Sequence, residues 1–104
     1  MATSEQTEAW QELLVGLDSG DRSVTADDAR KAIRADRTLD GVMVPVAYAG
    51  GVVASVTLRS EVLAYVDHVA AAIRLRDAGD VDGANACERI QQRIYRNLPA
   101  DWRW

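Results

Sequence analysis

Residues 41–58, GVMVPVAYAGGVVASVTL, decide the fold of this chain. The stretch has no charged side chain, and its many β-branched residues are typical of strands. Gly50 and Gly51 stand between two β-rich runs, which is a strong signal for a tight hairpin turn. Its length of about 18 residues is the lower limit for a membrane-spanning helix, but Pro45 and the two glycines interrupt it. We therefore predict a β-hairpin and no membrane span.

The predicted hairpin is apolar on both faces. A two-residue turn at Gly50-Gly51 pairs Ala49 with Val52, Tyr48 with Val53 and Val46 with Ser55. One face then carries Val42, Val44, Val46, Tyr48 and Val53, and the other carries Met43, Ala47, Val52, Ala54, Val56 and Leu58. Two strands alone are marginally stable in water. We therefore expect helices to cover one face and a second copy of the chain to cover the other.

Two short helices are predicted before the hairpin. The first, over residues 5–17, places four large apolar side chains on one face: Trp10, Leu13, Leu14 and Leu17. Gly20 lies in the turn that ends it. Thr25 is expected to cap the second helix, over residues 26–35, with Asp28 three residues later as in a capping box.

A pair of helices is predicted after the hairpin. Ser60 is expected to cap a helix over 61–78, and Asp80 a helix over 81–98, with Gly79 in the turn between them. The acidic turn RLRDAGDVDGANACERI at 74–90 suggests a calcium loop, but in neither register do its residues meet the ligand positions of such a loop. We assign its aspartates to helix capping and predict no metal site.

The predicted fold class is α+β, with two short N-terminal helices, a central β-hairpin and a C-terminal antiparallel αα-hairpin. At 104 residues the chain is long enough for one domain with one modest core. We divide that single domain, 1–104, into an N-terminal helix and turn (1–22), a helix plus β-hairpin (23–58), an αα-hairpin (59–98) and a tail (99–104).

Charge and cysteine content restrict the partners and the compartment. The formal net charge is −4, all of it in residues 1–40, which hold nine acids and five bases. A globally acidic chain is poorly suited to coating a phosphate backbone. The one cysteine, Cys87, cannot form an internal disulfide, and the N-terminal residues lack the features of a signal peptide. We expect a cytoplasmic protein.

No set of side chains in the sequence has a catalytic spacing. The one histidine, His68, follows Asp67, but adjacent residues on a helix point about 100° apart. His68 and Cys87 lie on separate predicted helices, so their spacing defines neither a nucleophile–base pair nor a zinc site. We predict that the chain is not an enzyme and binds no cofactor.

Several residues are candidates for contact with other molecules. The candidate protein interface consists of His68, Ala71, Leu75, Tyr48, Trp102 and Trp104. The small, uncharged face around His68 suits either a second helix or ordinary exposed alanines. Trp102 and Trp104 are either interface anchors or fold back onto the core.

The stripe of Arg89, Arg93 and Arg96 is either a solvated face or a surface for an acidic partner or nucleic acid.

Signals for a strand, a helix, a hairpin and a second helix follow one another over roughly residues 23–65. They are Ser23-Val24-Thr25, Asp28-Ala29-Arg30, Gly41, the hairpin around Gly50 and the helix after Ser60. This order resembles the prevent-host-death (Phd/YefM) antitoxins. The resemblance implies a dimer that represses its own promoter, with Arg30 as a candidate DNA contact, and binds a toxin through its C-terminal half.

The chain also departs from that family. Residues 1–22 precede the point where the family begins, and Gly51 and Val52 replace its usual basic residue and proline. We predict a small non-enzymatic protein-interaction module, serving as a regulator, inhibitor or structural subunit, which forms a homo-oligomer and binds another protein. The alternative is an antitoxin-like DNA-binding autorepressor, in which nucleic acid is a further partner.

Overall fold

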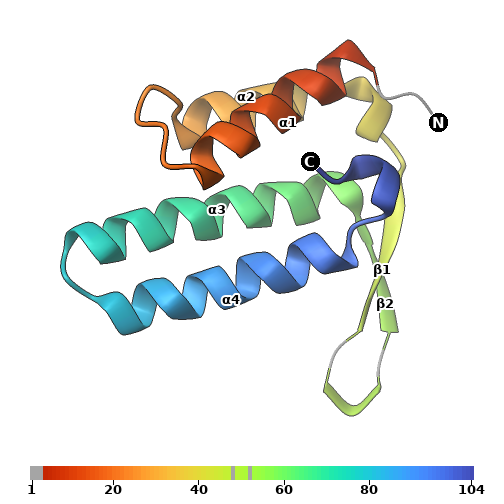
Figure 1. The fold of residues 1–104 in the computed structure, drawn as a ribbon. Coiled ribbons are helices and arrows are strands. Elements are labelled where there is room, and N and C mark those ends of the chain that lie inside the picture. The colour runs from red at the N-terminus through yellow and green to blue at the C-terminus, as the bar shows by residue number, and fades with distance from the viewer. Residues whose placement is uncertain (1–3, 48, 52) are drawn as a thin grey trace.

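The predicted α+β fold is confirmed by the computed structural model, which describes residues 4–47, 49–51 and 53–104. The helices and strands are α1 (Glu5–Asp18), α2 (Ala26–Ala35), β1 (Met43–Ala47), β2 (Val53–Thr57), α3 (Leu58–Asp77) and α4 (Val81–Asn97). Short 3-10 turns cover Arg37–Leu39, Ala49–Gly51 and Ala100–Trp102. Figure 1 shows α1 with α2 and α3 with α4 as two helix pairs, and the β-hairpin projecting away from them.

Local capping chemistry sets where two of the helices begin. The Thr25 hydroxyl accepts a hydrogen bond from the Asp28 backbone N–H, and the Asp80 carboxylate accepts one from the Gly83 N–H, as predicted. Gly79 adopts a φ of +84° in the turn between α3 and α4, which suits a residue without a side chain. Residues 23–25, which the Phd/YefM resemblance compares with a strand, form a turn and the cap of α2.

Helix α3 begins three residues earlier than the sequence predicts. Thr57, not Ser60, is its cap, and the Thr57 hydroxyl accepts a hydrogen bond from the Ser60 N–H. The Ser60 hydroxyl instead donates to the Thr57 carbonyl. The chain passes directly from β2 into α3 because Leu58, the first helical residue, is fully buried and anchors the junction in the core.

The predicted hairpin register is wrong by one residue. Val46 pairs with Ala54, not with Ser55, and the last described pair, Ala47 with Val53, encloses residues 48–52. The connection is therefore longer than a two-residue turn, although Gly50 and Gly51 both adopt positive φ. The predicted positions of Tyr48 and Val52 lie outside the described residues.

The shift in register changes which side chains share a face. Val44, Val46, Ala54 and Val56 lie on one face and are buried or half-buried. The opposite face, called here the hairpin outer face, is exposed and consists of Met43, Pro45, Ala47, Val53, Ser55 and Thr57. The prediction of two apolar faces is therefore corrected. The outer face mixes apolar side chains with two hydroxyl groups, but it carries no charge.

Apolar side chains from both helix pairs and both strands form one core. Its largest members without exposed surface are Trp10, Leu14, Ile33, Leu39, Leu58 and Leu98. The core also encloses one carboxylate, that of Asp36, which has 0% exposure. Buried charge is tolerated only where hydrogen bonds replace water.

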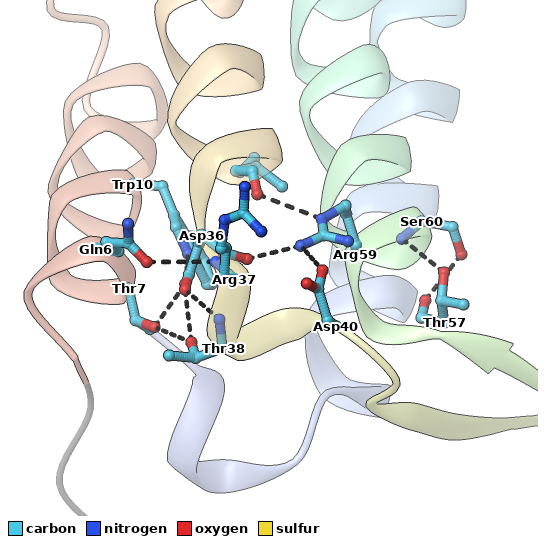
Figure 2. Close-up of polar contacts among 11 residues, drawn as sticks. Gln6, Thr7, Trp10, Asp36, Arg37, Thr38, Asp40, Thr57, Arg59 and Ser60 are labelled. Carbon is cyan, nitrogen blue, oxygen red and sulfur yellow. Dashed lines mark hydrogen bonds and ion pairs between the residues drawn. The ribbon is translucent and has the colours of Figure 1, made fainter.

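Asp36 is held by four hydrogen bonds from three residues, shown in Figure 2. One carboxylate oxygen accepts from the Thr7 hydroxyl at 2.6 Å and from Trp10 Nε1 at 2.8 Å. The other accepts from the Thr38 backbone N–H at 3.0 Å and the Thr38 hydroxyl at 2.5 Å. The Asp36 carbonyl also accepts from Arg59 Nη2 at 2.6 Å, so one residue connects α1, the end of α2 and α3.

We predict that this network makes the fold sensitive to acid. Burial raises the pKa of Asp36, but the hydrogen bonds from Thr38, Thr7 and Trp10 outweigh it and hold the pKa below its usual value of 3.8. A depressed folded-state pKa stabilises the fold fully above the unfolded value, and the contribution is lost as pH falls through the folded value. The melting temperature of the wild type should therefore fall more below about pH 4 than that of Asp36→Asn, which has no carboxyl group to titrate. Equal acid dependence in the two proteins would contradict this.

Candidate protein-interaction surfaces

The hairpin outer face exposes large apolar side chains on a projecting element. Met43 is 51% exposed and Val53 is 64% exposed. Figure 1 shows the hairpin projecting away from both helix pairs, and every residue of its outer face is exposed. Exposed apolar side chains that cluster together are typical of contact surfaces.

The face around His68 is only partly open. His68, Ala71 and Leu75 are half-buried on α3, and Ala72, which the sequence places with them, is buried. His68 Nδ1 lies 2.8 Å from the Ala64 carbonyl, so this nitrogen donates to the preceding turn of the helix. The structure thus gives His68 a partner within its own helix and leaves a narrow strip of small side chains at the surface.

Trp104 folds back onto the core, which is the second of the two alternatives for the tail. Its ring makes edge contacts with Trp10, Tyr65 and Tyr95, with centroids 5.9, 4.8 and 5.0 Å away. Trp104 Nε1 donates to Asp18 at 3.0 Å, and the Trp104 carbonyl accepts from the Tyr95 hydroxyl. Trp102 is also half-buried, and its carbonyl accepts from the Gln11 side chain.

A groove of about 670 Å³ lies between the end of α1 with the turn that follows it and the α3–α4 pair. Its apolar lining includes Leu17, Val24, Val69 and Ile73, and its polar lining includes Asp18, Asp21, Arg22, Arg76, Asp77, Glu88 and Gln91. Sequence reasoning missed this groove because its walls come from segments far apart in the chain.

Most charges around the groove are already paired. Arg22 lies 3.4 Å from Asp77, and Arg76 lies 2.6 Å from Glu88. The Tyr65 hydroxyl donates to Asp18 at 2.8 Å. Burial, followed by this hydrogen bond, raises the pKa of Tyr65, so the phenol remains a neutral donor. The groove therefore has apolar walls and a nearly neutral rim.

The three arginines of the stripe lie on the exposed side of α4. Arg89, Arg93 and Arg96 are all exposed, and within the part of the chain that the structure describes none forms an ion pair. Of the three, Arg96 lies in the last turn of α4, where cations interact favourably with the helix dipole. The stripe is thus available to an anionic surface.

Arg30 is placed differently from the stripe. It lies 2.8 Å from Asp27 and 2.9 Å from Asp67, and its side chain is mostly covered. The hydrogen bond to Asp67 is the main cause that raises the pKa of Arg30. Its charge is therefore already neutralised by two carboxylates, which makes it a poor phosphate contact in this arrangement.

Residues 4–47, 49–51 and 53–104 contain neither a cluster of metal ligands nor a helix that could span a membrane. There, no three or more His, Cys, Asp or Glu side chains are grouped so as to hold a metal ion. No helix in this part of the chain has the length and apolar character needed to cross a membrane. His68 and Cys87 are both half-buried.

No protein-family model, curated protein or solved structure matches this chain. Its function must therefore be argued from its own surfaces.

Proposed function

We propose that this chain is a non-enzymatic protein-interaction module that self-associates and binds a second protein, as a regulator, inhibitor or structural subunit. The observation that carries the proposal is the uncharged hairpin outer face, with Met43 and Val53 more than half exposed. An isolated two-stranded hairpin is marginally stable in water, whereas a sheet of three or more strands with an apolar face is more stable, so association of the hairpin with that of a second copy would stabilise it.

The shape of the chain supports self-association. Its extents are 40 × 39 × 18 Å and its radius of gyration is 14.0 Å, compared with about 13 Å for a compact chain of this length. Its accessible surface is 6299 Å², compared with about 5,800 Å² for a typical monomer of this mass. A flat chain with extra surface is suited to losing that surface in an interface.

The second partner is a protein with an acidic surface, because the Arg89, Arg93 and Arg96 stripe is exposed and without ion pairs among the described residues. An antitoxin-like repressor is less favoured. The net charge is −4, and Arg30 is already paired with two carboxylates. A salt-sensitive shift of a specific DNA duplex at low ionic strength would favour that alternative instead.

Sedimentation equilibrium of charged variants tests the self-association. The wild type should have a mass above that of the 11.4 kDa chain, and the double variant Met43→Glu/Val53→Glu should associate more weakly, because the carboxylates added to one hairpin repel those of the other copy. The matched control is Val15→Glu on α1, since Val15 is 52% exposed, close to the value for Met43. It should associate like the wild type. A wild type that remains monomeric at high concentration would overturn the proposal.

A further inference from the structure

The hydrogen-bond pattern of the hairpin shows which backbone groups point outward. The Leu58 N–H donates to the Val42 carbonyl at 2.8 Å, which extends the β1–β2 register by one pair. Hydrogen-bonded and non-hydrogen-bonded pairs alternate along an antiparallel ladder. Two pairs are therefore hydrogen-bonded, Val44–Val56 and Val46–Ala54. The other three, Met43–Thr57, Pro45–Ser55 and Ala47–Val53, direct their N–H and C=O groups away from the partner strand.

The two outer edges of the hairpin differ because different residues occupy the outward-pointing positions on β1 and on β2. On β1 the central outward position is Pro45, which has no N–H, and its carbonyl already accepts from Asn97 Nδ2 at 2.8 Å. On β2 the outward groups belong to Val53, Ser55 and Thr57. Among the described residues no hydrogen bond is formed by the backbone of Val53 or Ser55 on that side. The edge of β1 is therefore blocked, and the edge of β2 is open.

We propose that β2 of one copy pairs antiparallel with β2 of a second copy, with the two-fold axis at Ser55. This inference rests on the proposed self-association and places the contact between the two copies along the edge of β2. In this register Ser55 faces its own counterpart and Val53 faces Thr57, so no like charges meet. The result is a four-stranded sheet in the order β1-β2-β2-β1, in which the two hairpin outer faces become continuous.

A second copy is favoured over another occupant by the composition of the edge. Exposed edge strands in monomers usually carry a lysine, a proline or a covering segment that prevents pairing. β1 has such a feature in Pro45, whereas β2 has only uncharged residues, three of its five being β-branched. The blocked β1 edges also mean that the pairing closes at two copies and does not continue into a fibre.

Replacing Ser55 with proline or alanine separates this pairing from other modes of association. Ser55→Pro removes an outward N–H and no β1–β2 hydrogen bond, and the directly opposite residue is already a proline, Pro45. Each copy loses one intermolecular donor, so the dimer dissociation constant should rise about tenfold or more. Ser55→Ala keeps the N–H and should bind within about twofold of the wild type. Circular dichroism checks that the helices of both variants are intact.

Disulfide cross-linking provides a second readout that does not depend on the proline. In a Cys87→Ser background, Ser55→Cys should cross-link rapidly on oxidation, because facing residues of a hydrogen-bonded pair have Cα atoms about 5.5 Å apart, within disulfide range. Ser19→Cys, exposed at the end of α1, should not. If the wild type is a dimer but Ser55→Pro associates like Ser55→Ala, or Ser55→Cys fails to cross-link, the β2 pairing is wrong. A strictly monomeric wild type would overturn the self-association itself.

Discussion

Replacing Asp36 with alanine is expected to lower the free energy of unfolding by about 3–4 kcal/mol. The substitution removes four hydrogen bonds from Thr7, Trp10 and Thr38 to a carboxylate, and it leaves the buried Trp10 Nε1 without its partner. Each unsatisfied buried group costs about 1–3 kcal/mol. Because small domains are stable by only about 5–15 kcal/mol, the loss is a large fraction of the total. Urea unfolding followed by tryptophan fluorescence measures it.

Asp40→Asn is the matched control for this prediction. Asp40 is also an acid near the start of the hairpin, but its side chain is largely exposed and forms one ion pair, with Arg59 at 2.6 Å. Exposed ion pairs contribute about 0–1 kcal/mol. An Asp36→Ala variant that unfolds no more easily than Asp40→Asn would show that solvent or a rearranged side chain satisfies the four donors.

The burial of Asp36 could not be predicted from the sequence. Helix capping by Thr25 and Asp80 depends on residues three positions apart, and both were predicted correctly. Two of the three partners of Asp36, Thr7 and Trp10, are 29 and 26 positions away on α1, and only Thr38 is local. No local pattern distinguishes this aspartate from exposed ones, because its burial depends on how α1 packs on the end of α2.

The hairpin shows a second limit of local patterns. Two glycines between β-rich runs indicated the hairpin, but they did not determine the length of the turn. A shift of one residue moves every side chain to the other face, so the predicted faces were wrong although the strands were right. The register has an independent cause: Leu58 is buried and bonds to Val42 across the base of the hairpin.

The candidate surfaces were predictable to different degrees. The arginine stripe follows from helical periodicity alone, and the structure shows it exposed. The groove could not be predicted from helical periodicity, because α1, the turn after it, α3 and α4 all contribute to its walls. For the tail, the sequence left two alternatives open, since tryptophans serve both as interface anchors and as core residues. The cluster of Trp10, Tyr65 and Tyr95 that receives Trp104 forms only once three helices have packed.

Replacing Trp104 with alanine is expected to destabilise the fold by about 2–3 kcal/mol, less than the 3–5 kcal/mol typical of a fully buried tryptophan because Trp104 is half-buried. The loss combines three edge contacts between aromatic rings with the hydrogen bond to Asp18. Urea unfolding followed by circular dichroism measures the change without depending on the deleted fluorophore.

Trp102→Ala is the control for this second substitution, because Trp102 is the other half-buried tryptophan of the tail, and its ring packs on the core without joining the aromatic cluster of Trp104. Its cost should be smaller than that of Trp104→Ala, because no aromatic edge contact and no side-chain hydrogen bond is lost. Comparing the two variants therefore separates the contribution of the aromatic cluster around Trp104 from that of ordinary apolar packing by Trp102. Equal losses for the two variants would mean that the aromatic cluster does not hold the tail, and Trp104 would then return as a candidate anchor for a partner protein.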